Sequence, residues 1–457
     1  MSHAAHRRRA AALRARQRRH DRASSGHAAS AVRVSAALAD AFLTCRWRRI
    51  HLLRTGRRVL GARPPWLSRA VGAVLRAYRH PPADRPRELA AFLAALPGAG
   101  GRTLVPRYPI RVRRATPVRV VRMRWHTPRI DDVAALAGFL GLDGDELDWF
   151  ADRKEINRHA RDERLRHYRY TWLPTRLIEA PKPRLRAVQR RLLDDILGRL
   201  PVHAAAHGFV PGRGPHTFAA AHAGQPVVVR LDLAAFFSTI TAGRVYGLLR
   251  TAGYPEPVAH TLTALTTTRT PAGVCRRAPD WHKAALLRRP HLPQGAPTSP
   301  ALANLLAYRL DRRLTGLAGR FGAGYTRYAD DLAFSGPLGG GVAQRLIAAV
   351  TTVVTEEGFR VHPGKTRVRG RADRQLLTGL VVNERPAVPR AEYDHLRAVL
   401  HDAARNGLAA ADREGHADFP AYLRGRVAWV SHRHPSRAAK LHRLLAAALS
   451  GEATATS

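Results

Sequence analysis

The spacing of hydrophobic residues predicts helices near both ends of the chain and short strands in its middle. Residues 131–140 predict a capped amphipathic helix, and a second helix is expected around residues 147–150. From residue 184 to residue 200 apolar side chains follow the helical period, at Leu185, Val188, Leu192, Ile196 and Leu200. Beyond them, up to about residue 383, short β-type runs alternate with helices, and residues 386–449 are again expected to be helical.

Two aspartate sites occur beside predicted strands. Val227–Leu231 is rich in β-branched residues and predicts a strand that is buried on at least one face, with Asp232 near its C-terminal end. Tyr325–Ser335 predicts a strand, a tight turn and a second strand, and the pair Asp330-Asp331 falls at the turn. Both sites therefore place carboxylates at strand ends.

These carboxylates are candidates for a metal site. A carboxylate beside a buried strand is costly unless it is paired or binds a cation, and a divalent cation offsets the repulsion between two adjacent carboxylates. An isolated Asp-Asp pair is most often a turn former, and the pairs at 131–132 and 194–195 lie in helical patterns, where solvated or capping roles are expected. If Asp232 and Asp330-Asp331 converge on two divalent ions, those ions can activate a hydroxyl group and stabilise the leaving oxygen at a phosphorus atom.

The charge of the chain indicates a polyanionic partner. Lys and Arg together number 77 against 34 Asp and Glu, so the formal net charge is +43. Residues 1–130 contain 30 arginines and only four acids, Asp21, Asp40, Asp84 and Glu88. A GC-rich genome would explain 72 arginines against 5 lysines, but not the shortage of acids. We therefore expect the chain to bind nucleic acid.

The composition also excludes several classes of protein. A hydrophobic content of 45% excludes a wholly disordered chain, and no run approaches about 18 uninterrupted apolar residues, so no membrane span or membrane partner is expected. Cys45 and Cys275 lie far apart, which excludes a disulfide framework and a cysteine-based zinc site and fits a reducing cytoplasm. The arginine-rich start, through Arg22, is expected to be a flexible or weakly helical arm, with a transit peptide as the alternative, and residues 451–457 are expected to be frayed.

Three motifs resemble those of a reverse transcriptase. Tyr328-Ala-Asp-Asp331 resembles motif C of that family, and Asp232 followed by Phe236-Phe237 resembles motif A. Between them, Leu292–Pro300 resembles motif B. Each motif alone is moderately specific, whereas all three in this order, with Gly379 downstream, indicate the family.

The residue types of the motif B segment predict a tight loop followed by a helix. Gly295 permits a close approach of the backbone, and Ser299 is expected to cap a helix with Pro300 at its first position. Gln294 is then expected to point its amide toward the bound nucleotide or template. We therefore assign Gln294 and Gly295 to nucleotide binding.

The resemblance extends over about residues 130–450 and implies roles for further residues. Lys365 lies in a segment similar to motif D and is implied to protonate the departing pyrophosphate, with a solvated loop position as the alternative. Arg176 resembles a triphosphate ligand of the fingers, because a guanidinium fork suits phosphate oxygens. Phe237 stands where the family places an aromatic steric gate against the ribose 2′-hydroxyl, with core packing as the alternative.

The branch of the family is identified as the bacterial retron type, within the group II intron and retron-like enzymes. The segment Thr378–Asn383, which is similar to the primer-grip region, and His222 before motif A are typical of it. Tyr328, Thr378 and Gly379 are therefore implied to contact primer or template.

Three departures from the family pattern stand out. Leu377 precedes Thr378-Gly379 where retron-type enzymes usually carry Val, and Phe218 occupies a position that is often Asn. The fingers hairpin lacks its usual Lys-Gly tip before Arg176, so we expect weaker gripping of the nucleotide and lower processivity. The first 125 residues match no family segment that we can place, and no ribonuclease H, integrase or HNH nuclease segment is apparent.

The resemblance implies an α+β, right-hand polymerase fold, with fingers, a palm built on a small antiparallel sheet, and a helical thumb. Residues 1–125 are expected to form a basic, mostly helical and partly flexible extension, and residues 126–225 the N-terminal helices and fingers. Residues 226–383 are expected to form the palm with inserted fingers helices, and residues 384–457 the helical thumb and tail.

The function implied is RNA-directed DNA synthesis by nucleotidyl transfer with two Mg²⁺ ions, for which Mn²⁺ is an alternative. Asp232, Asp330 and the carbonyl of Leu233 are expected to bind the ions, and Asp331 completes the site or supports it from outside. Implied partners are an RNA template, deoxynucleotides and the DNA product.

The biological role implied is that of a retron enzyme, which makes DNA from a cognate structured RNA in anti-phage defence, with an effector protein of unknown identity. The alternatives are an RNA chaperone or maturase-like protein with a weak or inactive site, and an untemplated polymerase in phage defence.

Overall fold

The computed structural model describes residues 30–99, 102–112, 122–153, 155–158, 160–174, 176–278, 280–432 and 434–450. The basic arm and the frayed tail that the sequence predicts lie outside these residues. The described chain divides into two compact units. The first unit contains the residues up to Arg153 together with Tyr246–Leu265, and the second contains the remainder.

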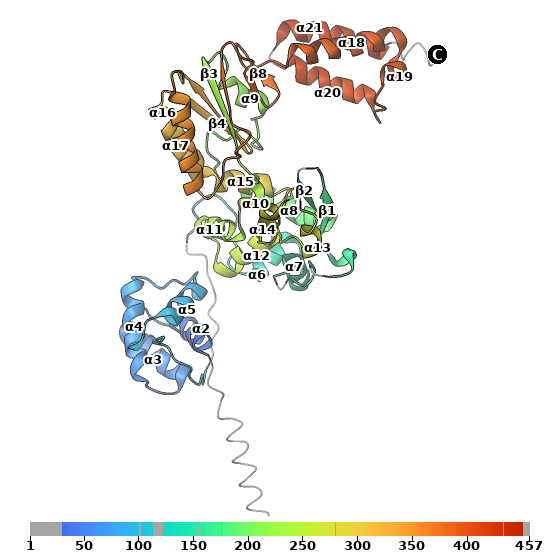
Figure 1. The fold of residues 1–457 in the computed structure, drawn as a ribbon. Helices are drawn as coiled ribbons and strands as arrows, with labels where there is room; N and C mark the ends of the chain where they lie inside the picture. Colours follow the sequence, from blue (N-terminus) through green and yellow to red (C-terminus); the bar gives the residue numbers. More distant parts are fainter. Residues whose placement is uncertain are drawn as a thin grey trace, which may run out of the picture. The chain divides into compact units, whose positions relative to one another are not determined.

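Four helices at the start of the first unit form a module with its own core (Figure 1). They are α2 (Ala31–Phe42), α3 (Arg49–Leu60), α4 (Pro65–Ala77) and α5 (Pro86–Ala95). Helix α2 packs against α5 and α3, and α3 packs against α4. Because α4 and α5 each begin with proline, whose fixed φ suits the first helical position, their starts are locally encoded.

The first unit also contains two short helices and a segment from the middle of the chain. Helix α6 (Val133–Leu140) is capped by Asp132, and α7 (Gly144–Ala151) begins with a capping box, so both predicted helices are confirmed. The inserted segment includes α12 (Glu256–Thr266) and the end of α11 (Ala242–Ala252). Glu256 accepts a hydrogen bond from the backbone N–H of Arg87 at 2.6 Å, which ties the insertion to the helical module.

A four-stranded antiparallel sheet forms the centre of the second unit. Its strands lie in the order β4 (Gly324–Tyr328), β5 (Asp331–Gly336), β3 (Val227–Asp232) and β6 (Arg367–Gly370). Both predicted features are confirmed: β3 is a buried strand that ends at an aspartate, and β4 and β5 are joined by a tight turn. The fold is α+β, with small antiparallel sheets and many helices.

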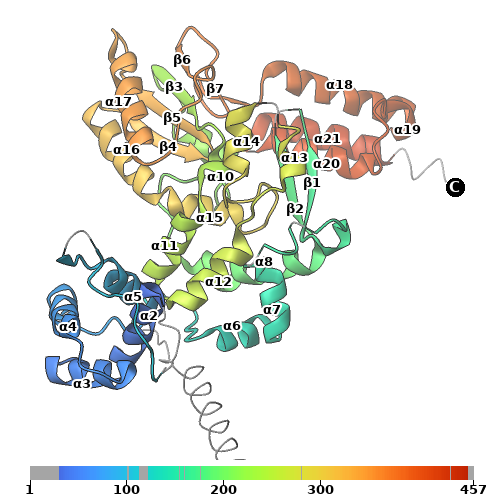
Figure 2. The same ribbon diagram turned by 60° about the horizontal axis from the view of Figure 1, so that its bottom comes forward.

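One face of this sheet is covered by helix α16 (Tyr308–Arg320), on which α17 (Val342–Glu356) packs (Figure 2). Asp311 of α16 bonds Tyr325 and Arg327, so these β4 side chains point to the covered face. Arg327 lies opposite Leu332 in the register. Because neighbouring side chains of a strand point to opposite faces, Asp331 projects from the other face.

Two small hairpins and several short helices complete the second unit. The hairpins are β1 (Tyr168–Trp172) with β2 (Leu177–Pro181), and β7 (Leu376–Leu377) with β8 (Leu380–Val381). The helices are η2 (Glu163–Leu165), α8 (Pro183–Asp195), η3 (Leu197–Arg199), α9 (Pro215–Ala220), α10 (Phe236–Thr239), α13 (Ala272–Cys275), α14 (Trp281–Leu287) and α15 (Ser299–Leu306).

The helix predicted over residues 184–200 is shorter than its periodicity suggests. It ends at Asp195, and the last turn is the 3₁₀ helix η3. Gly198 and Pro201 disfavour continuation of an α-helix at this point, whereas the apolar pattern continues because Ile196, Leu197 and Leu200 are still buried. The pattern thus reports burial, not helix length.

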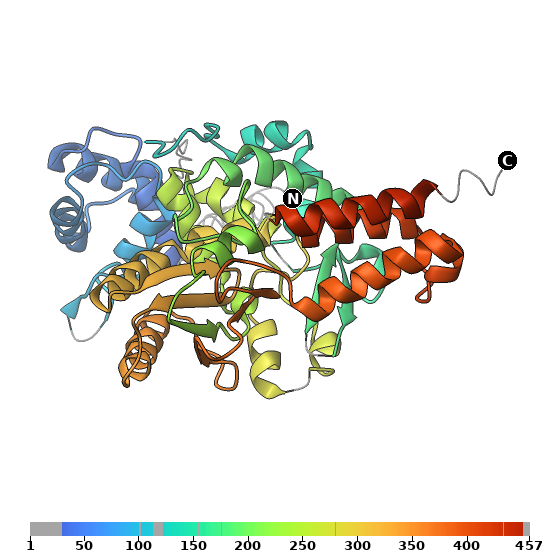
Figure 3. The same cartoon turned by 90° about the horizontal axis from the view of Figure 1, so that it is seen from above.

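The C-terminal segment is helical, as predicted. It contains α18 (Arg390–Asn406), α19 (Leu408–Ala411), α20 (Phe419–Ser431) and α21 (Pro435–Ser450). Helices α18 and α21 run side by side, and α20 packs on both (Figure 3). Their core is continuous with Val228 and Ala333 of the sheet, so this segment packs toward the face that carries Asp331.

Among the described residues, no helix combines the length and the apolar character needed to cross a membrane.

Candidate active site

Three carboxylates that lie far apart in the sequence meet where β3 ends and β5 begins. Asp232 and Asp331 are directly opposite each other in the β3–β5 register, which corresponds to a Cα–Cα separation of about 4.5–5.5 Å. Asp330 lies next to them in the β4–β5 turn, and its carbonyl accepts a hydrogen bond from the N–H of Leu233 at 2.9 Å. The backbone therefore fixes all three residues at one end of the sheet.

The carboxylates are close enough to perturb one another. Burial raises the pKa of Asp330, and the charges of Asp232 and Asp331 raise it further. Burial also raises the pKa of Asp331, with the charge of Asp232 acting in the same direction. Such mutual repulsion in a partly buried site favours the binding of a cation.

Two cationic side chains contact this cluster. The guanidinium of Arg230 donates to both carboxylate oxygens of Asp331, with N–O distances of 2.7–2.9 Å. The Nζ of Lys365 lies 3.1 Å from Oδ2 of Asp232. The backbone also holds Asp232, because its carbonyl accepts from the N–H of His362 at 2.7 Å. The structure thus brings Lys365 to the site, as the family resemblance implies.

The donor set fits a divalent metal ion, although the side chains are not gathered into a complete ligand shell. In the described part of the chain, no group of three or more His, Cys, Asp or Glu side chains is placed to hold a metal. Here Arg230 engages both oxygens of Asp331, and Lys365 engages one oxygen of Asp232. The carboxylate oxygens of Asp232 and Asp330 are hard ligands of the kind that Mg²⁺ prefers, and the ammonium of Lys365 marks a position where a cation is already stabilised.

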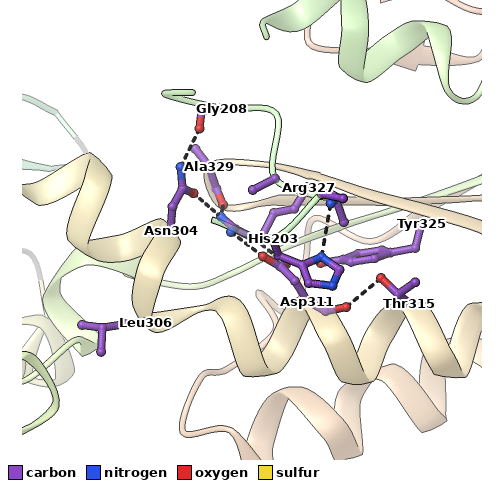
Figure 4. Close-up of polar contacts among 12 residues, drawn as sticks. His203, Gly208, Asn304, Leu306, Asp311, Thr315, Tyr325, Arg327 and Ala329 are labelled. Atoms are coloured by element: carbon purple, nitrogen blue, oxygen red, sulfur yellow. Dashed lines mark hydrogen bonds and ion pairs between the residues drawn. The ribbon is translucent and has the colours of Figure 1, made fainter. Parts of the chain in front are cut away.

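A fully buried ion pair supports the Asp330 turn from the opposite face (Figure 4). Arg327 donates to both oxygens of Asp311 at 2.7 and 2.8 Å, to Oδ1 of Asn304 at 2.9 Å and to the carbonyl of Ala329 at 3.0 Å. Tyr325 donates to Asp311 at 2.8 Å. Because Arg327 and Asp311 neutralise each other and make further hydrogen bonds, both charges can be buried. Through these bonds the ion pair joins α15 and α16 to the turn.

The turn itself is strained and tightly packed. Ala329 has a φ of +55°, a conformation that residues with a Cβ rarely adopt. The loop carrying Gly208 lies against it: a Cβ added at Gly208 would come within 2.6 Å of the Ala329 nitrogen. Asn304 also donates to the Gly208 carbonyl at 2.7 Å. Only glycine fits this approach, which locks the position of Asp330.

The aromatic residues of motifs A and C pack against other rings. Phe236 is buried and lies against Phe359, with ring centroids 5.5 Å apart, so it packs in the core. Phe237 is only half-buried, and its ring lies 6.4 Å from that of Phe209. Phe209 is half-exposed and is also 6.4 Å from Tyr328, so it links Phe237 to the motif C tyrosine.

The Gln294-Gly295 loop is fastened to the β1–β2 hairpin. The carbonyl of Gln294 accepts from the N–H of Glu179 at 2.8 Å. Gly295 has a φ of +133°, and a Cβ there would lie 3.1 Å from the Glu179 carbonyl, so the predicted close backbone approach is confirmed. The Glu179 carboxylate is buried between Thr270 and His291, at 2.7 and 2.9 Å.

The capping role expected of Ser299 is wrong. The residue before the helix is Thr298, and Ser299 is the first helical residue. The Ser299 hydroxyl instead donates to the carbonyl of Pro293 at 2.7 Å. It closes the motif B loop on itself, because a buried hydroxyl needs a partner and this carbonyl is the one within reach.

Arg176 lies at the tip of the β1–β2 hairpin. Its carbonyl accepts from the N–H of Leu173 at 2.8 Å, so only residues 174 and 175 lie between the two closing residues. The Arg176 side chain is exposed, and within the described residues it makes no contact with the three carboxylates. The structure thus presents Arg176 to solvent and does not join it to the aspartate cluster.

Thr378 and Gly379 form the two-residue turn of the β7–β8 hairpin. Both have positive φ, +46° and +84°, as a type I′ turn requires. Glycine adopts this conformation freely, whereas threonine is strained in it, and the Thr378 hydroxyl is buried without a hydrogen-bond partner in the described structure. Strain together with an unsatisfied hydroxyl is typical of a functional position.

His222 is a structural residue within the core. Its Nδ1 and Nε2 lie 2.7 Å from the hydroxyls of Ser335 and Thr326, on β5 and β4. Burial lowers the pKa of His222 to about 4, so the ring is neutral at physiological pH. The residue fastens together the two strands that flank the Asp330 turn.

Two charged residues of this site, Arg230 and Arg327, are not expected from the sequence. Arg230 lies two residues before Asp232, and strand alternation alone would have placed it on the same face. Arg327 lies inside the motif C segment, but its partner Asp311 is distant on α16. No local pattern distinguishes such a buried charge from an exposed one.

Comparison with known proteins agrees with this geometry. The family model for reverse transcriptase (RNA-dependent DNA polymerase) matches residues 174–379, which include all three aspartates. The retron Mx65 reverse transcriptase of Myxococcus xanthus is 45% identical over 294 residues, which is 62% of this chain and 66% of that protein. The retron Mx162 reverse transcriptase of the same organism is 42% identical over 328 residues, which is 67% of this chain and 65% of that protein.

A further relative is covered more completely. The retron Ec73 reverse transcriptase of Escherichia coli is 31% identical over 266 residues, which is 54% of this chain and 78% of that protein. The chain belongs to the retron reverse transcriptase family. It spans slightly less than two thirds of the length of the two Myxococcus relatives.

Proposed function

We propose that this chain is an RNA-directed DNA polymerase of the retron type. The observation that carries the proposal is the meeting of Asp232, Asp330 and Asp331 at one end of an antiparallel sheet, on motifs of the reverse transcriptase family. A cluster of this kind suits transfer at phosphorus, and a net charge of +43 suits a nucleic-acid substrate.

The parts of a right-hand polymerase can be assigned on this basis. The four-stranded sheet with α16 and α17 would be the palm, the β1–β2 hairpin with α8 would belong to the fingers, and α18–α21 would be the thumb. The sheet face that bears Asp331 would then form the floor on which the primer terminus lies. The first 125 residues would be an extension to this core.

Asp232, Asp330 and the carbonyl of Leu233 would hold two Mg²⁺ ions, or Mn²⁺, and the ions would activate the primer 3′-hydroxyl and stabilise the leaving oxygen. Asp331 would keep its ion pair with Arg230 and would support the site from outside the metal ligands. Lys365 would leave Asp232 and offer its Nζ proton to the departing pyrophosphate. Its exposed stem gives it the freedom to make this move.

The nucleotide would lie between the motif B loop and the aromatic residues. Gln294 and Gly295, fastened to β2, would form one wall, and Phe237 would stand against the sugar and exclude a 2′-hydroxyl. Arg176 at the hairpin tip would reach the triphosphate. Because only two residues separate the closing pair of that hairpin, the grip of the fingers would be weak.

Tyr328 and the Thr378-Gly379 turn would contact the primer and template. The strained backbone of Thr378 supports such a role, since strain of this kind is typical of functional positions. A structured RNA recognised by this chain would serve as template, as the retron names of the relatives suggest, and a role in anti-phage defence would follow from that class.

The alternative of an RNA chaperone or maturase-like protein with an inactive site is not favoured. All three carboxylates are present at one end of the sheet, and a buried network supports the turn that carries Asp330. A merely binding protein would have no need of this arrangement.

The experiment that tests the proposal is incorporation of labelled dTTP on poly(rA)/oligo(dT) with Mg²⁺. We expect incorporation by the wild-type chain and none by the Asp330→Ala, Asp331→Ala double variant, with both chains folded by circular dichroism. Incorporation by the double variant would refute the assignment of the site. Incorporation without any template would indicate an untemplated polymerase instead.

A further inference from the structure

The helical module of the first unit carries an unusually long stretch without acids. Between Asp40 and Asp84 the chain contains ten arginines and no aspartate or glutamate. This stretch includes all of α3 and α4. Like charges at this density disfavour the compact state, so their presence in a folded module requires a reason.

The arginines are displayed on a defined surface. Helix α3 buries Leu52, Gly56, Val59 and Leu60 against the core of the module. Its other side borders a surface hollow of about 570 Å³, which we call the arginine hollow, lined by Arg49, Ile50, Leu53, Arg54, Arg57 and Arg63. The side chains of Arg54, Arg57 and Arg63 are exposed.

The geometry of α3 aligns the cations. Arg49, Leu53 and Arg57 are spaced by four residues and therefore lie in one row along the helix, with Ile50 and Arg54 in the adjacent row. Arg49 is fixed because its Nη2 donates to Ser68 Oγ on α4 at 2.8 Å. Arg49 and Arg57 lie eight residues apart, which corresponds to about 12 Å of helix and is too long for one small anion to bridge.

The local sequence opposes this arrangement unless an anion binds. Arg49 stands in the first turn of α3, where the helix dipole disfavours a cation, and Arg54 lies three and four residues before Arg57 and Arg58, so like charges face one another along the helix. The dipole favours Arg57 and Arg58 in the last turn, but it does not remove this repulsion. The next acids along the chain cannot neutralise them, because Asp84 pairs with Arg250 and Glu88 with Arg85. Such violations of local preference are expected at functional sites.

The chemistry of the hollow fits an RNA strand. A row of guanidinium groups suits successive phosphates, and Ile50, which is 71% exposed, offers an apolar contact for a ribose or a base. An extended polyanion can span the whole row, which a free phosphate or a nucleotide cannot.

We propose that the arginine hollow binds the backbone of the template RNA and tethers it to the first unit. This inference rests on the proposed function, because that function supplies the RNA. The hollow lies in the first unit, whereas the three aspartates belong to the second. RNA binding and nucleotide transfer can therefore be tested separately.

The test compares two full-length variants with the same change in charge. The hollow variant is Arg54→Gln, Arg57→Gln and Arg63→Gln, which keeps Arg49 and its bond to Ser68. The control variant is Arg312→Gln, Arg320→Gln and Arg345→Gln, which removes three exposed arginines from α16 and α17 on the covered side of the sheet. Glutamine preserves helix propensity, so both variants are expected to fold, and their melting curves check this.

Binding is measured by fluorescence anisotropy with a labelled RNA hairpin of about 40 nucleotides over a range of salt concentrations. We expect the hollow variant to bind about tenfold or more weakly and to lower the slope of log Kd against log salt by about 3, one for each lost phosphate contact. The control variant should match the wild type. Equal affinities and slopes for the hollow variant and the wild type, or equal losses in both variants, would overturn the proposal.

Two further measurements separate this proposal from others. With a structured RNA template, the hollow variant should raise KM by about tenfold and leave kcat within about twofold. If the wild type extends no primer at all, the proposed function fails, whereas the anisotropy comparison still decides the role of the hollow.

The second measurement is binding to vesicles of phosphatidylcholine and phosphatidylserine in a ratio of roughly 3:1. If the wild type binds these vesicles and the hollow variant does not, while RNA binding persists in the variant, the hollow binds a membrane surface and the proposal is overturned.

Discussion

Arg230 and Asp331 form a bidentate ion pair on the sheet face that carries the three aspartates. Both carboxylate oxygens of Asp331 accept from the guanidinium, and the two residues lie on neighbouring strands, 101 positions apart in sequence. The charge of Arg230 lowers the pKa of Asp331 and opposes the larger effect of burial, which raises it. Arg230 therefore favours the ionised form of Asp331 and orients its carboxylate within a cluster of like charges.

Replacement of Arg230 should shift the pH dependence of the reaction. In Arg230→Gln the pKa of Asp331 rises, so Asp331 takes up a proton at a higher pH than in the wild type. We expect the acid limb of the pH–rate profile to move upward by about one unit, with a loss of about tenfold in rate at a pH on that limb. Initial rates of primer extension between pH 5.5 and 8.5, in about 0.1 M salt, measure both effects.

Arg230→Lys is the matched variant for this experiment. It keeps the positive charge but loses the fork that binds both oxygens, so it should restore the position of the acid limb and only part of the rate. A pH profile of Arg230→Gln that superimposes on that of the wild type would show that the ion pair does not act on the reaction.

The Asp330 carboxyl should cost stability at neutral pH. Burial raises its pKa in the folded chain, so the ionised form is disfavoured by folding at every pH above that pKa. Asp330→Asn should therefore raise Tm at pH 7, by about 1–3 °C, while it abolishes primer extension. Below the ordinary carboxyl pKa both states are protonated, and the gain should vanish.

Asp194→Asn is the control for this comparison, because Asp194 is exposed on α8. It should change neither Tm nor activity. A lower Tm for Asp330→Asn at pH 7 would contradict the conclusion that the buried, ionised Asp330 destabilises the folded chain.

His222 should make the second unit sensitive to acid. Its pKa is lowered to about 4 by burial, whereas an unfolded histidine titrates near 6.5. The unfolded chain therefore binds the proton first, so the stability that neutral His222 contributes is present above pH 6.5 and is lost as the pH falls toward 4. The loss from this residue amounts to about 3 kcal/mol over that range.

Urea unfolding followed by intrinsic fluorescence at pH 7 and pH 5 measures this effect. His222→Gln should be less stable than the wild type at pH 7, because the contacts to Ser335 and Thr326 are altered, but it should lose less stability between the two pH values. Burial also lowers the pKa of His203 and His207, so a residual slope is expected in the variant. Identical slopes in the variant and the wild type would exclude a neutral, buried His222.

Phe237 and Phe236 should separate sugar selection from core packing. Phe237 is half-buried beside Phe209, whereas Phe236 is buried against Phe359. Phe237→Ala should reduce discrimination against ribonucleotides by about tenfold or more, because it removes a contact that rejects the 2′-hydroxyl. The ratio of kcat/KM for dTTP and UTP on poly(rA)/oligo(dT) measures this discrimination.

Phe236→Leu serves as the control, since it should lower Tm and leave the dTTP to UTP ratio unchanged. The steric-gate assignment fails if Phe237→Ala keeps the discrimination of the wild type.

Local patterns in the sequence predict much of this fold. The β-branched run before Asp232 predicts β3, and the alternation around Asp330 predicts the β4–β5 hairpin, because strand burial and turn chemistry are local properties. Glycine and proline likewise mark helix starts and close approaches. The helix expected over residues 184–200 is too long, because buried apolar residues continue beyond Asp195, where the α-helix ends. Hydrophobic periodicity alone therefore does not locate a helix end.

Pairing between distant side chains could not be predicted in this way. The Arg327–Asp311 pair is fully buried, although charged residues are usually exposed, and only the packing of α16 on β4 explains it. The contact of Arg230 with Asp331 requires the register of β3 and β5, which the sequence alone does not specify. Ser299 does not cap its helix because the fold of the loop brings the carbonyl of Pro293 within reach of its hydroxyl.

RNA-directed synthesis by this chain is tested by sequencing the DNA that it makes on a heteropolymeric RNA template with an annealed DNA primer and Mg²⁺. We expect full complementarity to the template for the wild type and for Asp194→Asn, and no product for Asp232→Asn or Asp330→Asn. Complementary DNA from either of the last two variants, or product from the wild type that bears no relation to the template, would contradict this expectation.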